Sequence, residues 1–265
     1  MNDGSESSRR RSVKAIRASV KFDFDEYDLT GFLPIAADFG MDRYGYVATP
    51  NVDGLIRVYE DPEFRHAYAR ASYVLLDSRF AAVVFRIVHG VRVPVAPGSD
   101  LTVALLSEVI APGDRIVLVG SSADQAEILR RRYGLKHLLH HNPPMGFISD
   151  PSAVDVVLEF VERSAPFRFC LIAIGDPQGT LIAHRLAERG RARGLALIVG
   201  ASIDFVTGKQ RRAPRWMQRC SLEWLHRLLS NPRRLARRYL VRNPRFFAYV
   251  GHWRVSVRSP VSGLR

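Results

Sequence analysis

Residues 115–120 read RIVLVG, residues 167–175 read FRFCLIAIG, and residues 195–200 read LALIVG. Each stretch is a short, continuous apolar run, as expected of a strand that is buried on both faces of a parallel sheet. Helical patterns of apolar residues follow or separate them, at residues 123–132, 151–163 and 181–193. Strands that alternate with helices in this way predict an α/β protein with a Rossmann-like parallel sheet flanked by helices.

The first half of the chain shows the same pattern less clearly. Residues 46–51 (YVATPN) and 73–77 (YVLLD) look like strand ends that run into polar residues, and residues 62–71 between them predict a helix. Ligands of such sheets bind at the carboxyl ends of the strands. In the second half those ends are Gly120, residues 175–177 (GDP) and residues 200–202 (GAS).

The composition divides the chain into three parts. Residues 1–20 are rich in Ser and Arg and predict a disordered basic arm. Residues 21–208 form the predicted α/β core, and residues 209–265 a basic, amphipathic helical appendage at the C-terminus. The two cysteines, Cys170 and Cys220, do not suggest a disulfide framework, so we expect a reducing, cytoplasmic location.

The C-terminal segment carries most of the positive charge. The chain has 39 Lys and Arg against 26 Asp and Glu, and between residues 209 and 245 Glu223 is the only acid. Aromatic and aliphatic residues lie among the arginines. Such a stretch can dock on an anionic membrane surface or bind the phosphates and bases of nucleic acid.

Several sequence motifs occur together. Residues 200–208 read GASIDFVTG, residues 212–214 read RAP, and residues 222–228 read LEWLHRL. Upstream lie T-P-N at 49–51, L-D-S at 76–78, G-S-D-L at 98–101 and P-P-M-G-F at 143–147. This series resembles the WecG/TagA/CpsF glycosyltransferases (glycosyltransferase family 26) over roughly residues 30–250.

The resemblance implies an activity and a location. It implies an inverting hexosyl- or N-acetylhexosaminyltransferase that moves a sugar from a UDP-sugar to an undecaprenyl-diphosphate-linked saccharide. The setting would be bacterial exopolysaccharide or related surface-polysaccharide synthesis. The enzyme would be peripheral on the inner face of the plasma membrane, and the basic appendage would bind that membrane and complete the active site. This favours the membrane over nucleic acid as its partner.

The resemblance also implies site residues. Asp77 would be the catalytic base, although an aspartate there could equally cap a helix. Thr49 and Asn51 would contact substrate. Further substrate contacts are expected from Gly120, Gly175, Pro177, Gln178, Gly200, Asp204, Arg211 and Arg212. From the residues alone, Asp204 could bind a ribose or sugar hydroxyl, or brace its own loop. Residues expected at the membrane or the diphosphate are Arg215, Arg227, Arg233, Arg234, Arg237 and Arg238.

The sequence departs from the family pattern at a few positions. Gly179 and Thr180 stand where the family has Gln and Glu, Val95 stands in place of an Arg, and Ser78 in place of a Gly. A second hypothesis therefore stays open, a catalytically degenerate relative that binds lipid-linked saccharide or acts as a scaffold. Whether an apolar stripe on the first-half helices serves a homo-oligomer also stays open.

We expect no metal ion and no cofactor in the reaction. The pair Asp23 and Asp25 forms a D-x-D pattern, but it lies ahead of the first recognisable strand and is interpreted as solvated surface. The cluster of His137, His140 and His141 has no carboxylate or cysteine to complete a metal site. The diphosphate charge would then be met by arginines and backbone amides.

Overall fold

A computed structural model of the chain describes residues 20–214, 216–217 and 223–259. Its main sheet has six strands in the order β3-β2-β7-β6-β4-β5, and every neighbouring pair is parallel. The strands are β2 (Tyr44–Ala48), β3 (Tyr73–Val74), β4 (Arg115–Val119), β5 (His137–His141), β6 (Phe169–Ile172) and β7 (Gly194–Ile198). The predicted α/β fold with a parallel sheet is confirmed.

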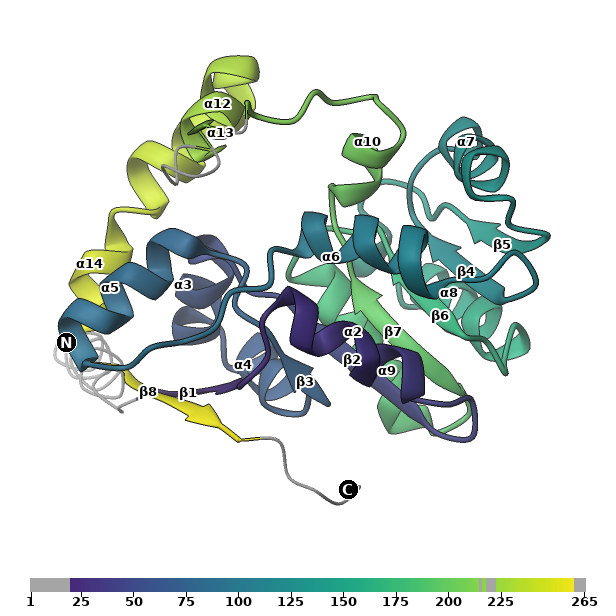
Figure 1. The fold of residues 1–265 in the computed structure, drawn as a ribbon, viewed down its shortest axis with the longest axis horizontal. Coiled ribbons are helices and arrows are strands. Elements are labelled where there is room, and N and C mark those ends of the chain that lie inside the picture. Colours follow the sequence, from purple (N-terminus) through teal and green to yellow (C-terminus); the bar gives the residue numbers. More distant parts are fainter. Residues whose placement is uncertain (1–19, 215, 218–222, 260–265) are drawn as a thin grey trace, which may run out of the picture.

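Helices cover both faces of this sheet because its strands are apolar on both sides (Figure 1). Along β7, for example, Ala196 and Ile198 pack into one buried cluster, whereas Leu195 and Leu197 pack into the other. The first face carries α3 (Val52–Glu60), α4 (Pro62–Ala69), α8 (Pro151–Arg163) and α9 (Gln178–Arg189). The second face carries α2 (Leu29–Asp38), α6 (Gly98–Ala104), α7 (Ala123–Tyr133) and α10 (Ser202–Val206).

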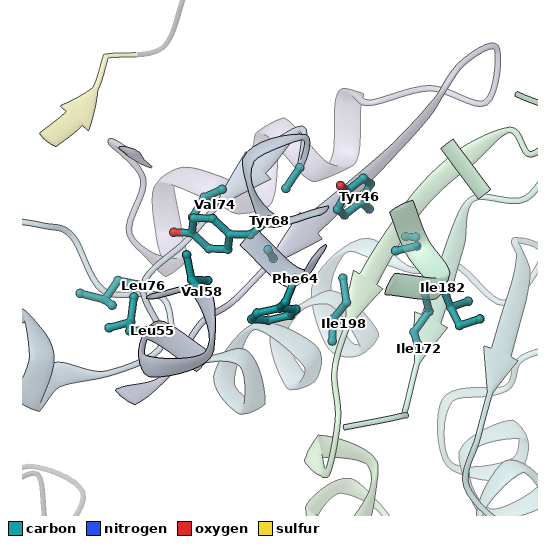
Figure 2. Packing of buried hydrophobic residues seen from close by; sticks show 14 of the residues in the cluster. Tyr46, Leu55, Val58, Phe64, Tyr68, Val74, Leu76, Ile172, Ile182 and Ile198 are labelled. Carbon is teal, nitrogen blue, oxygen red and sulfur yellow. The ribbon is translucent and has the colours of Figure 1, made fainter. Parts of the chain in front are cut away.

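The first cluster is dense around β2 and the two helices that follow it. Figure 2 shows Tyr46 of β2 and Phe64 and Tyr68 of α4 in this cluster, together with Leu55 and Val58 of α3. Phe64 and Leu55 are no more than 1% exposed. The end of β2 and the start of α3 are therefore held rigidly, which matters because both contribute polar side chains to the site described below.

A second, two-stranded sheet joins the two ends of the described chain. In it β1 (Lys21–Asp25) pairs in parallel with β8 (Arg254–Arg258). Phe22 of β1 is fully buried, and its ring centroid lies 4.7 Å from that of Trp253. Residues at the end of the basic segment thus pack directly on the first strand of the core.

This small sheet changes the interpretation of the D-x-D pattern. Asp23 and Asp25 do not precede the first strand; they lie within β1. Asp23 accepts a hydrogen bond from Ser256 of β8. Asp25 accepts from the Val74 amide at 2.6 Å and pairs with Arg258 at 2.8 Å. Both carboxylates therefore fasten β1 to its neighbours.

The basic C-terminal segment is helical, as expected. It contains α12 (Glu223–Ser230), α13 (Pro232–Ala236), a π-helical stretch η3 (Arg237–Arg242) and α14 (Arg245–Val250). These elements arch away from the sheet and come down beside α5 (Arg79–His89) and α3 (Figure 1). In the part of the chain described here, no helix is both long and apolar enough to cross a membrane. The proposed division at residues 20 and 208 stays a prediction, and residues 1–19 lie outside the described residues.

Candidate active site

Asp77 lies just beyond the carboxyl end of β3. It is half-buried, and its Oδ1 accepts a hydrogen bond of 2.6 Å from the amide of Gly98, the first residue of α6. The cap of α5 is the next residue, Ser78, whose side chain accepts from the Ala81 amide. Asp77 is thus not the cap of the helix that follows it. Instead it bridges to a different helix and faces the space between them.

Thr49 and Asn51 lie at the end of the neighbouring strand β2. A Cβ placed on Gly98 would lie 3.1 Å from Thr49 Oγ1 and 3.6 Å from Asp77 Oδ1, so both side chains converge on the same glycine. Asn51 is the N-cap of α3, where its Oδ1 accepts from the Asp53 and Gly54 amides. The same oxygen accepts from Arg238 at 3.2 Å. The carboxyl ends of β2 and β3 therefore place all three expected residues at one edge of the sheet.

A pocket of about 420 Å³ opens beside these residues. Its polar lining from the core includes Asn51, Asp53, Asp77 and Asp100. Its apolar lining comes from both parts of the chain, as Val52, Phe80, Trp224, Tyr239 and Phe247. Arg79, Arg238 and Glu223 complete the charged part of the wall. The pocket thus combines four carboxylates, two cations and a broad aromatic surface.

The C-terminal helices are held against the core by ion pairs around Asp53. This carboxylate has 9% of its side chain exposed and lies 3.1 Å from Arg57, 3.2 Å from Arg242 and 3.7 Å from Arg238. Two turns further along α3, Glu60 pairs with Arg242 and Arg245. Carboxylates on one helix face thus fix the position of the basic segment. The sequence analysis missed Asp53, although its place two residues after the T-P-N motif was a usable signal.

A second attachment holds the start of the basic segment. Arg212 donates to the Asp100 carboxylate and, at 3.2 Å, to the Ser99 hydroxyl, both at the start of α6. Its Nε lies 3.9 Å from Glu223 of α12. Arg212 therefore borders the pocket through Asp100, whereas Arg211 is exposed.

The remaining arginines expected at the membrane or diphosphate are distributed unevenly. Arg233 and Arg237 are exposed, and Arg238 lines the pocket. Arg215 lies outside the described residues, and so do the side chains of Arg227 and Arg234. Of this set, Arg238 is the one whose described contacts reach the expected substrate residues.

The other expected substrate residues lie along the same edge of the sheet, at the ends of β4, β6 and β7. They are Gly120, Gly175, Pro177, Gln178, Gly200 and Asp204, and they do not line the pocket. A Cβ on Gly175 or Gly200 would meet nothing within 4 Å, so the space above these two glycines is open. Gly120, by contrast, is packed against the Ala173 carbonyl.

Asp204 has contacts that brace its own loop. Its Oδ1 accepts from Gln125 Nε2 at 2.8 Å and lies 3.7 Å from Lys209 Nζ. Gln125 also completes a capping box with Ser122 at the start of α7. These contacts favour the interpretation that Asp204 braces its own loop over the interpretation that it binds a ribose or sugar hydroxyl.

The departure at Gly179 and Thr180 has a local structural explanation. A Cβ on Gly179 would lie 2.7 Å from the Ile174 carbonyl, so this backbone leaves no room for a glutamine side chain. Thr180 donates its hydroxyl to Asp176 Oδ1 at 2.7 Å. Burial raises the pKa of the Asp176 carboxyl, although the hydrogen bonds from Thr180 act in the opposite direction. The family's Gln and Glu are thus replaced here by Gly179, which has no side chain, and by Thr180, which bonds to Asp176.

The histidine cluster forms the edge strand β5. His140 Nε2 lies 3.1 Å from the Gly120 carbonyl and 3.2 Å from the Ser121 carbonyl, so it bonds to the turn that precedes α7. His137 is exposed. Burial lowers the pKa of His141, with a smaller contribution from His140. Within the described residues these three histidines are not grouped as metal ligands.

A parallel sheet that presents a carboxylate at a strand end, beside arginines and an open, partly apolar pocket, is an arrangement that suits a glycosyltransferase. The model of the "Glycosyl transferase WecG/TagA/CpsF family" matches residues 19–260, and the chain therefore belongs to this family. A relative from Bacillus spizizenii is 23% identical over 250 residues, which cover 92% of this chain and 94% of the relative. That protein is named N-acetylglucosaminyldiphosphoundecaprenol N-acetyl-beta-D-mannosaminyltransferase.

Proposed function

We propose that this enzyme transfers an N-acetylhexosamine-type sugar from a UDP-sugar, with inversion, to a saccharide carried on undecaprenyl diphosphate. The observation that carries the proposal is the shared pocket, in which Asp77 of the core lies beside Arg238 and Trp224 of the basic segment. The name of the Bacillus relative supports a lipid-linked acceptor of this kind.

Inverting transfer needs one base and a stabilised leaving group. In the proposed reaction Asp77 takes the proton of the acceptor hydroxyl as its oxygen attacks the anomeric carbon of the sugar. The bond from that carbon to the diphosphate breaks, and UDP leaves with the electron pair. A carboxylate at this position suits the first step. Cationic groups suit the second, since they stabilise charge that develops on the leaving diphosphate.

Two arginines of the pocket can meet a diphosphate. Arg238 reaches Asn51, and Arg79 begins α5 directly after Ser78. Arginine binds phosphate oxygens through paired N–H groups, which gives both charge and direction. We therefore assign the diphosphate of donor or acceptor to the space between these two guanidinium groups, with Thr49 and Asn51 on the sugar side.

The aromatic wall suits the lipid part of the acceptor. Phe80, Trp224 and Phe247 line the pocket and are 36%, 39% and 62% exposed. The centroids of the Phe80 and Phe247 rings lie 5.9 Å apart, so α5 and α14 form one continuous apolar edge. An acceptor with a charged head and a hydrocarbon tail matches a site that is polar on one side and aromatic on the other.

The same edge continues into a surface suited to a membrane. Along α5, Val83 and Ile87 are 55% and 76% exposed, and in η3 Leu240 and Val241 are 62% and 58% exposed. Exposed arginines lie nearby in the chain, among them Arg86, Arg233 and Arg237. Apolar side chains with a basic rim bind the interface of an anionic bilayer. We propose that this surface, comprising α5, η3 and α14, places the pocket at the cytoplasmic membrane face.

The test is UDP release with a panel of UDP-sugars and a short-chain polyprenyl-diphosphate N-acetylglucosamine. We expect acceptor-dependent release with one donor and a product of inverted anomeric configuration by NMR. If the acceptor binds without any donor and no UDP is released, the result would instead favour the second hypothesis, that this chain is a catalytically degenerate protein that binds lipid-linked saccharide. The absence of space for a glutamine at Gly179 is the observation in favour of that second function.

A further inference from the structure

Three potential metal ligands lie together on the face of the protein formed by α4 and α9. His66 comes from α4, and His184 and Glu188 come from successive turns of α9. One donor atom from each residue lies within 4.8 Å of the other two. Glu188 Oε1 and His184 Nε2 are 3.5 Å apart. None of the three lines the pocket described above.

Tyr46 determines which nitrogen of His184 carries the hydrogen. The Tyr46 hydroxyl donates its hydrogen to the Ala67 carbonyl, which can only accept. The same hydroxyl oxygen lies 3.4 Å from His184 Nδ1 and must therefore accept from it. Because neutral imidazole carries one N–H, His184 Nε2 is left with a lone pair that faces Glu188.

Two acceptors that face each other need a cation between them. A proton on Nε2 could serve, but a metal ion bound by the Nε2 lone pair and the Glu188 carboxylate would satisfy both acceptors and would also bring in His66.

We propose that His66, His184 and Glu188 bind a first-row transition-metal ion such as Zn²⁺. In a tetrahedral zinc site with bonds of about 2.1 Å, neighbouring ligand atoms are about 3.4 Å apart, close to the spacing of His184 and Glu188. Two imidazoles and one carboxylate suit Zn²⁺ rather than Mg²⁺ or Ca²⁺. The Tyr46 hydroxyl would orient the buried ligand, as outer-shell partners do in metal sites. His66 and Glu188 are exposed, which leaves the remaining coordination position to water.

The ion would join α4 to α9, both of which pack on the face of the sheet beside Tyr46 (Figure 2). Because α4 comes from the first half of the chain, after β2, and α9 from the second half, after β6, the ion would hold the two halves of the core together. This role is structural, so the expectation that the transfer reaction needs no metal is not affected.

The test uses the untagged, full-length protein after treatment with a chelator. We expect one equivalent of Zn²⁺ in calorimetric titration, a rise in Tm with zinc, and visible absorption of low-coordinate Co²⁺ when cobalt replaces it. His66→Ala and Glu188→Gln change exposed side chains and are expected to fold, and each should weaken binding at least tenfold. His137→Ala, at an exposed histidine of β5, should bind as tightly as the wild type. Equal zinc binding by the wild type and the double variant H66A/E188Q would overturn the proposal.

Discussion

The guanidinium of Arg242 lies 3.2 Å from the carboxylate of Asp53, so the basic C-terminal segment is anchored at the first turn of α3. Arg238 shares this carboxylate and also donates to Asn51, which caps the same helix. Arginines expected to meet phosphate therefore already have partners in the core. Their positions are set before substrate arrives, which reduces the cost of ordering the site on binding.

Asp53→Ala should loosen the basic segment and lower stability. Removing one partner of a buried ion pair leaves the other charge uncompensated, and because the three arginines are partly exposed we expect about 1–3 kcal/mol here. Urea denaturation gives the change in the free energy of unfolding, and hydrogen exchange should show faster exchange in η3 and α14. The matched control is Arg245→Ala, whose side chain is 52% exposed and should cost less than about 1 kcal/mol. Unchanged exchange in η3 would mean that Asp53 does not hold the segment.

Asp77→Asn should abolish most of the transfer while the protein stays folded. Asparagine keeps an oxygen that can accept from the Gly98 amide, but it cannot take a proton from the acceptor. The loss of a general base lowers kcat by about 10²- to 10⁴-fold. Steady-state UDP release and thermal melting measure the two properties separately. Ser78→Ala is the neighbouring control: it removes a helix cap at a cost of about 1 kcal/mol but should retain most activity. Wild-type turnover in the Asp77 variant would remove the catalytic assignment.

Gly98→Ala should reduce activity more than its small size suggests. The added methyl group would lie 3.1 Å from Thr49 Oγ1 and 3.6 Å from Asp77 Oδ1, which is tight for the first and ordinary contact for the second. We expect kcat to fall about tenfold because small displacements of catalytic groups are costly. Gly113→Ala, where a Cβ meets nothing within 4 Å, is the control. Equal activity in the two variants would show that Gly98 does not position Thr49 or Asp77.

Asp176→Asn should stabilise the protein at neutral pH. Burial raises the pKa of this carboxyl in the folded state. Ionisation of Asp176 is therefore less favourable in the folded state than in the unfolded chain, and at neutral pH it lowers the free energy of unfolding. Below the ordinary aspartate pKa of 3.8 the group is protonated in both states, and wild type and variant should then be alike. The difference should grow as the pH rises through the raised pKa of the folded state. Urea denaturation at several pH values measures it, and a difference that shrinks with rising pH would contradict the prediction.

Ile87→Asn should weaken binding to anionic vesicles and leave the pocket chemistry intact. The side chain is 76% exposed near the C-terminal end of α5, and its burial in a bilayer interface contributes roughly 1–2 kcal/mol. Co-sedimentation with phosphatidylglycerol vesicles should therefore show about a tenfold weaker association. Ile128→Asn on α7, at a side chain that is 42% exposed, is the matched control. Equal sedimentation of both variants would exclude α5 from the docking surface.

The strands of the second half could be predicted because their environment leaves a simple pattern. In β4, β6 and β7 both faces are buried, so nearly every residue is apolar and the run stands out from the helices around it. The predicted strand at residues 167–175 is nevertheless too long, since β6 ends at Ile172. The last three residues of that run are apolar or glycine but belong to the turn before α9.

The small sheet of β1 and β8 and the edge strand β5 were harder to predict from the sequence. β1 and β8 pair across the whole chain, and neither strand shows in its own sequence that the other exists. β5 reads HLLHH, and the sequence analysis, which rejected its histidines as a metal site, did not predict a strand there. Pairing between distant segments depends on tertiary contacts, which local patterns do not record.

The positions of the expected site residues could be predicted only in part, for a similar reason. Asp77 and Asn51 were assigned from the family resemblance, and they lie together because parallel strands end at a common edge. The partners that the basic segment finds on the core, Asp53 and Glu60, are ordinary acids in a helix sequence. Their role arises only when residues nearly 190 positions away fold back onto them.

The pairing of β1 with β8 makes the order of synthesis important. The strand that carries Phe22 and Phe24 is made before its hydrogen-bonding partner, which follows 233 residues later in the chain. Before β8 is made, these two rings cannot pack in the buried cluster that contains Trp253 and Phe246. A nascent or shortened chain would therefore expose aromatic surface that is prone to aggregation. Removing residues beyond 208 would create the same exposed surface. Burial of β1 therefore requires that the chain extend as far as β8.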